Sequence, residues 1–246
     1  LCLMALVYFL VRAGLPFPDT RVLLHTAIIG LLLLMTFMGG RIIAPAVAGT
    51  LEKKGIPLEA RVQPLIEGWL LAILPLAMVC ILFTATEILA GLLLLAASLL
   101  IIVRVARWKL WHCTDRPDLL VLAIGYLWLA AGAAVTGVHL VAGHALLPAL
   151  HVIAVGALGT LSCSVMLRLA WQRACRRFPP AWQVLVIAVL IALASVGRYL
   201  AGPLPFSQPA LLWLAAGAWS LAYLGLFAQL LHLYSAFTKK GKANNG

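Results

Sequence analysis

Long apolar stretches, separated by short polar or proline-containing breaks, dominate this chain. They predict eight helices, at about residues 1–11, 21–40, 67–84, 87–105, 118–140, 145–170, 182–201 and 208–235. Only helices and closed barrels satisfy all their backbone polar groups in lipid. We therefore expect an all-α fold, a polytopic transmembrane helix bundle with about eight spans.

The composition agrees with lipid as the main solvent. The chain is 64% hydrophobic and 10% charged, whereas a soluble domain is about a quarter charged. We expect one transmembrane domain over residues 1–246, with a short disordered tail at 239–246. Because Leu1 lies inside an apolar run, we also expect a fragment that lacks N-terminal spans and begins with a truncated helix.

The positive charges fall on one side of the predicted bundle. Of the 18 Lys and Arg residues, all but Arg12, Arg21 and Arg198 lie in 41–66, in 104–116, in 168–177 or near the C-terminus. The positive-inside rule makes this side, and with it the C-terminus, cytoplasmic. This bias accounts for the net charge of +11, so we expect contact with membrane lipid and no nucleic-acid partner.

Two spans share a pattern, at His25–Arg41 and at His151–Arg168. In each, a glycine follows the histidine by five residues and the arginine closes the span. Ionisable side chains inside a membrane are costly and usually functional, so we expect His25 and His151 to form one site, as ligands of a metal or a haem iron. The glycines would either open room for a flat macrocycle or serve close helix packing. Each histidine could instead bond a polar group on a neighbouring helix.

Further candidates lie on the same side of the bundle. His139 and His144 could join His151 in a second metal site, or could simply be polar loop residues. Arg198 and Arg21 could bind haem propionates, although Arg198 could also extend to the lipid headgroups. Imidazole suits copper or haem iron, whereas Mg²⁺ and Ca²⁺ prefer the carboxylates that are scarce here.

Two segments resemble the NnrS family. The stretch HTAIIGLLLLMTFMGGRIIAP (His25–Pro45) is similar to its His…Gly-Gly-Arg…Pro element, and ALHVIAVGALGTLSCSVMLR (Ala149–Arg168) to its later His…Gly…Met-x-Arg element. The likeness covers nearly the whole chain. It departs after Arg168, where LAWQRACRRFPP replaces the family's usual Leu-Gly-His-Thr-Gly-Arg.

The resemblance implies a multi-pass protein of the bacterial inner membrane that contains haem and copper and takes part in the response to nitric oxide and nitrosative stress, often near denitrification genes. It carries His25 and His151 over as metal-site candidates. We expect nitric oxide or a related small molecule as ligand and an unidentified redox partner, without assigning an enzymatic reaction. The alternatives are a small-solute transporter without metal, built on a parallel repeat, and a structural subunit of a respiratory complex.

Overall fold

The computed structural model describes residues 20–58, 62–204 and 206–244, with the backbone alone over 236–244. The described residues contain helices and no strand, which confirms the predicted all-α fold. The main elements are α2 (Thr20–Glu52), α3 (Pro64–Cys80), α4 (Glu87–Arg107), α5 (Pro117–Val141), α6 (Leu147–His151), α7 (Leu158–Cys175), α8 (Ala181–Leu200) and α9 (Pro209–Asn244). A π-helical segment, η4 (Val152–Ala157), joins α6 to α7. The helix predicted at 1–11 lies outside the described residues.

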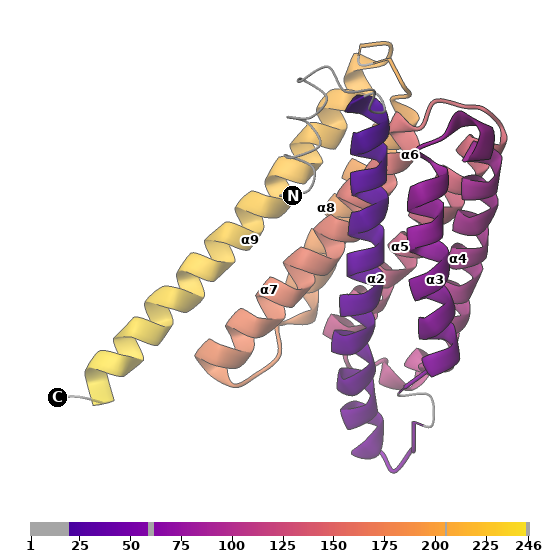
Figure 1. The fold of residues 1–246 in the computed structure, drawn as a ribbon. Coiled ribbons are helices and arrows are strands. Elements are labelled where there is room, and N and C mark those ends of the chain that lie inside the picture. Colours follow the sequence, from indigo (N-terminus) through magenta and orange to yellow (C-terminus); the bar gives the residue numbers. More distant parts are fainter. Residues whose placement is uncertain (1–19, 59–61, 205, 245–246) are drawn as a thin grey trace, which may run out of the picture.

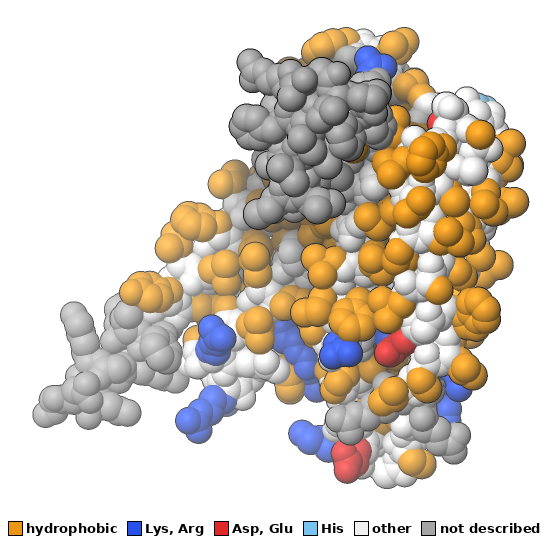
Figure 2. Space-filling model, in the orientation of Figure 1, with side chains coloured by type: hydrophobic (Ala, Val, Ile, Leu, Met, Phe, Trp, Pro, Cys, Tyr) orange, Lys and Arg blue, Asp and Glu red, His pale blue; other side chains and the backbone are white. Residues whose placement is uncertain are grey.

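Within the described residues, six helices are long and apolar enough to cross a membrane, so this is a multi-pass membrane protein. The continuous segment Leu147–Cys175 counts as one of them, and α3 is a shorter apolar helix of 17 residues. The two ends of the bundle differ in chemistry. We call the end where α2, α4 and α7 finish the basic end, where Figure 2 shows the Lys and Arg side chains gathered, and the opposite end the histidine end.

The first described helix, α2, is longer than the sequence predicted. It spans 33 residues and continues through Gly39, Gly40 and Pro45. A Cβ on Gly39 would lie 3.0 Å from the ring of Tyr126, and one on Gly40 would overlap the guanidinium of Arg104. The glycine pair therefore receives side chains from neighbouring helices, and it does not end the helix as we had expected.

The last helix, α9, also exceeds its predicted end at 235. Its backbone is helical to Asn244, so it enters the segment 239–246 for which we predicted disorder. Lysine and alanine, which occur in this segment, have good helix propensity, and this favours continuation of the helix.

The core is divided between two groups of helices that share α5. The larger buried cluster joins α2, α3, α4, α5 and the start of the α6–α7 segment. The smaller one joins α7, α8 and α9 to Val121 of α5. In Figure 1, α2 to α5 stand together while α9 slants away from them, and most of its side chains are exposed on the outside of the bundle. Cavities at the boundary between the two groups are the natural places to look for a site.

Candidate functional site

The two histidines that the sequence paired line two different cavities at the histidine end. His25 lines a cavity of about 580 Å³ together with Arg21, Leu147 and Pro203. We call this the Arg21 cavity. His151 lines a second cavity, of about 270 Å³, between η4, α8 and α9, and Arg198 lines it too. We call this the Arg198 cavity. Each cavity thus holds one imidazole and one guanidinium from the predicted set.

The imidazole of His151 has a fixed orientation. Its Nδ1 lies 2.6 Å from the carbonyl oxygen of Leu147, one turn earlier. Because a carbonyl only accepts, Nδ1 carries the hydrogen, and in the neutral ring Nε2 keeps the lone pair that a metal binds. Hydrogen bonds of this kind commonly orient histidine ligands. The residue also directly precedes η4, and π-helical turns are frequent at functional sites.

Arg198 shares the cavity with His151 and is partly buried. One of its terminal nitrogens donates to the carbonyl of Gly202, 3.2 Å away, so the side chain extends towards the turn that follows α8. A guanidinium has five N–H donors, and this bond leaves others for an anionic group. The carboxylate of a ligand is a suitable partner for a cation at this position.

The glycines beside the two histidines serve helix packing. A Cβ on Gly156 would lie 2.8 Å from Oγ of Ser195 and 2.9 Å from the ring of Trp128. One on Gly30 would lie 3.2 Å from the terminal methyl of Met78. Side chains of other helices already fill the space next to both glycines, so neither opens room for a macrocycle.

His139 is held by groups of the protein itself. Its Nδ1 donates to the carbonyl of Ala145 at 2.7 Å, and its Nε2 lies 3.3 Å from the hydroxyl of Tyr199. The ring of His144 packs edge-on against it, with 5.6 Å between ring centroids. Both nitrogens of His139 are thus engaged in closing the loop after α5 onto α8. This arrangement favours a structural role, and metal binding by His139 and His144 stays a prediction.

The residues at the histidine end fit a haem or a copper ion only in part. Over the described residues, no group of three or more His, Cys, Asp or Glu side chains could hold a metal ion. The Arg198 cavity lies just below the range of about 300–1,000 Å³ that encloses a drug-sized ligand. Its polar groups would provide one imidazole ligand, from His151, and one cation for a propionate, from Arg198. The cavity therefore suits the edge of a haem and does not enclose a whole one.

A buried ion pair in the basic half of the bundle was not predicted from the sequence. Arg104 is 3% exposed and pairs with Glu67 at the start of α3. It also donates to the hydroxyl of Tyr126 at 3.0 Å, and that hydroxyl donates to the carbonyl of Thr36 at 2.8 Å. This network links α2, α3, α4 and α5. The signal in the sequence was an arginine near the end of the apolar helix α4, which we had counted only as a cytoplasmic cation.

A second network ties the basic ends of α5 and α7 together. Arg116 donates two hydrogen bonds of 2.9 Å to the buried carboxylate of Asp118, and Arg168 lies 3.3 Å from the same carboxylate. The ring of Phe178 covers the guanidinium of Arg116 at 3.4 Å. By contrast, Arg41 is exposed over Phe37. The two arginines of the supposed repeat therefore have different roles.

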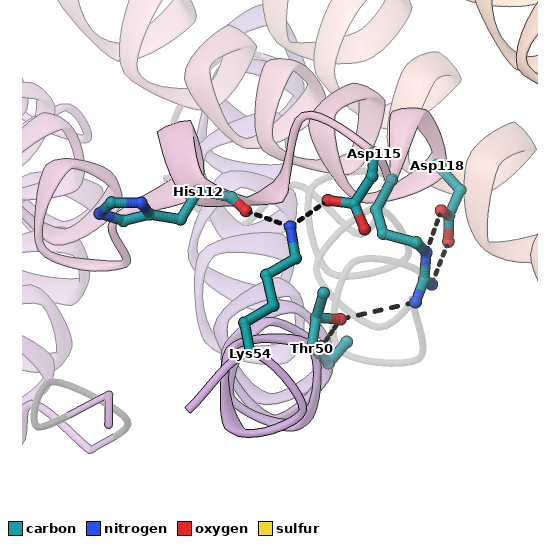
Figure 3. Close-up of polar contacts among 7 residues, drawn as sticks. Thr50, Lys54, His112, Asp115 and Asp118 are labelled. Atoms are coloured by element: carbon teal, nitrogen blue, oxygen red, sulfur yellow. Dashed lines mark hydrogen bonds and ion pairs between the residues drawn. The ribbon is translucent and has the colours of Figure 1, made fainter. Parts of the chain in front are cut away.

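An exposed ion pair lies next to this network, as Figure 3 shows. The ammonium of Lys54 donates to the carbonyl of His112 at 2.7 Å and to the carboxylate of Asp115. The hydrogen bond from Lys54 holds the pKa of the Asp115 carboxyl below its usual range. Lys54 thus fastens the loop before α5 to the end of α2.

A family model described as "NnrS protein" matches residues 1–236, which is nearly the whole chain. No curated protein and no solved structure matches it. The family resemblance expected from the His25–Pro45 and Ala149–Arg168 segments is confirmed.

Proposed function

Because the chain belongs to the NnrS family, we propose that it is a haem- and copper-binding membrane protein that acts in nitric oxide metabolism or in protection against nitrosative stress. Membership of the family is consistent with a membrane protein linked to the response to nitric oxide. The finer statement, that it binds haem and copper, is the part that needs an experiment.

The observation that carries the proposal is the pairing of His151 with Arg198 in one cavity. The carbonyl of Leu147 holds the imidazole by Nδ1, which leaves Nε2 as the ligand atom. Arg198 supplies a cation for a propionate on the same cavity wall. His25 and Arg21 repeat this combination in the neighbouring cavity, which makes His25 the second candidate ligand.

The residues of this chain would bind and orient the cofactor. A haem iron or copper ion held by these residues would supply the binding of nitric oxide. The rest of the Arg198 cavity wall is largely apolar, with Trp219 and three alanines among its residues. Such a wall admits a small, nearly apolar gas and disfavours water.

We further propose that the protein lies in the bacterial inner membrane with its basic end, and so its C-terminus, in the cytoplasm. The clustering of Lys and Arg at one end supports this orientation. It places both histidine cavities on the opposite side of the bilayer. A redox partner would then approach them from that side or from within the membrane.

The test is an ultraviolet–visible spectrum with metal analysis of the purified full chain, oxidised, reduced and exposed to nitric oxide. We expect a Soret band that shifts with nitric oxide and is lost or strongly reduced in His151→Ala and in His25→Ala. The matched control is His112→Ala, because that side chain is exposed at the basic end and only its backbone carbonyl makes a hydrogen bond to Lys54.

Two results would count against the proposal. A folded parent protein without a Soret band and without stoichiometric copper would overturn it and favour the transporter without metal. A Soret band that survives both histidine substitutions would place the haem elsewhere, and would remove His25 and His151 from the site.

A further inference from the structure

Methionines gather at a third cavity, far from the histidines along the helices. Its volume is about 260 Å³, and Met35 and Met38 of α2 and Met166 of α7 line it. The chain has five methionines, and Met4 lies outside the described residues, so three of the four described ones meet here. We call it the methionine cavity.

The backbone explains why these side chains share one space. Met35 and Met38 are three residues apart on α2, so they lie on the same face of that helix. Figure 1 shows α7 slanting away from α2 towards the basic end, and α5 supports both helices. Met35 is 8% exposed, whereas Met38 and Met166 are 48% and 51% exposed. Met35 is thus buried between the helices, whereas Met38 and Met166 are about half exposed on the outside of the bundle.

The donor set is chemically selective. Thioether sulfur is a soft, neutral ligand that favours Cu(I), whereas Cu(II), Mg²⁺ and Ca²⁺ prefer nitrogen or oxygen ligands. Apart from Ser162, the other lining residues are aliphatic or glycine, with no carboxylate, imidazole or thiol among them. We propose that Met35, Met38 and Met166 bind one Cu(I) ion. This inference rests on the proposed function for its choice of copper, and it gives that copper a site separate from His151.

The charge balance limits the site to a monovalent ion. A desolvated charge is costly, and neutral thioethers leave the charge of the ion uncompensated. The cations nearest in sequence, Arg41 and Arg168, are not fully neutralised, because Arg41 is exposed and Arg168 shares Asp118 with Arg116, and they disfavour any second positive charge on the ion. A divalent ion would carry a larger uncompensated charge at a higher desolvation cost, so the neutral donor set favours a monovalent ion.

The experiment is an anaerobic Cu(I) titration of the purified full chain against a chromophoric Cu(I) chelator, with X-ray absorption at the copper edge. The variants are Met35→Leu, Met38→Leu, Met166→Leu and the triple substitution. Leucine nearly conserves the volume of methionine, so the fold should be kept. The matched control is Met78→Leu. Met78 of α3 packs against Gly30 of α2 and does not line this cavity.

We expect the parent to bind one Cu(I) with sulfur ligands only. Each single substitution should weaken binding by at least about 10-fold, the lower end of the loss typical of an outer-shell partner. The triple variant should lose the ion, while Met78→Leu should match the parent.

The outcomes separate this inference from the proposed function. A triple variant that keeps the parent affinity, or a parent that binds no Cu(I), overturns the methionine site. Copper that shows nitrogen ligands and disappears in His151→Ala overturns it as well, while the proposed function stands. Copper on sulfur in a protein without a Soret band supports the methionine site and removes the haem.

Discussion

The carboxylate of Asp118 should be the most sensitive single group at the basic end. It is 2% exposed, lies in the first turn of α5 and faces two arginines, Arg116 and Arg168. Asp118→Asn keeps the shape of the side chain and removes its charge. The two guanidiniums, whose side chains are only 17% and 13% exposed, then face each other without a counter-charge.

The expected loss follows from these burials. Breaking a buried ion pair by removing one partner costs about 3–5 kcal/mol. Both arginines retain some contact with solvent, so we take the lower end, about 3 kcal/mol. The lost interaction of the carboxylate with the α5 dipole adds about 0.3–1 kcal/mol. The total, about 3.3–4 kcal/mol, corresponds for a chain of this length to a fall of roughly 7–16 °C in the unfolding midpoint.

The assay is thermal unfolding of the purified protein in detergent, followed by circular dichroism. Asp115→Asn is the matched control, because Asp115 lies on the same loop in an exposed pair with Lys54, and exposed pairs contribute little to stability. Arg168→Gln should cost less than Asp118→Asn, since it leaves the Arg116–Asp118 pair neutral. The charge argument is wrong if Asp118→Asn and Asp115→Asn have the same unfolding midpoint. It is also wrong if Arg168→Gln lowers the midpoint more than Asp118→Asn does.

Two further predictions test packing and local electrostatics. Gly156→Ala should lower the free energy of unfolding by about 1–3 kcal/mol through overpacking. Gly49→Ala, with nothing within 4 Å of the added methyl, should be neutral or slightly stabilising. Equal thermal unfolding of the two variants would mean that open space adjoins Gly156. Burial raises the pKa of the Cys113 thiol, and the nearby charge of Lys54 only partly offsets this rise. At neutral pH, maleimide should therefore label native Cys113 more slowly than the less buried Cys175, and the difference should disappear on unfolding. Equal labelling rates in the native protein would refute the burial of Cys113.

Much of the fold follows from the sequence because hydropathy and lipid leave few options. Helix positions from 67–84 onward agree with the structure to within a few residues, except for the extensions of the α6–α7 segment and α9. The error in α2 has a physical cause. A Gly-Gly pair followed by proline normally marks a helix end, but here Arg104 and Tyr126 fill the space above the glycines and stabilise the helix.

The candidate site was harder to predict, because a repeated spacing gives depth in the membrane and not direction around the helix axis. His25 and His151 do lie at the same end, as the spacing indicated. The direction of each side chain depends on which helices are neighbours, and the π-helical turn after His151 changes the helical register locally. The two residues therefore line adjacent cavities, and Leu147, whose carbonyl orients His151, lines the cavity of His25.

The His25–Pro45 segment of α2 thus has two physical roles at two depths in the bundle. Towards the basic end it accommodates the guanidinium of Arg104, whose pair with Glu67 ties α4 to α3 and thereby fixes α2 in the bundle. Towards the histidine end the same rigid helix carries His25 to the Arg21 cavity. A buried ion pair adds little stability in itself, but it penalises every arrangement that leaves either charge unpaired in lipid. We therefore interpret the basic half of α2 as the part that fixes its position, and its histidine half as the part that carries the candidate ligand His25.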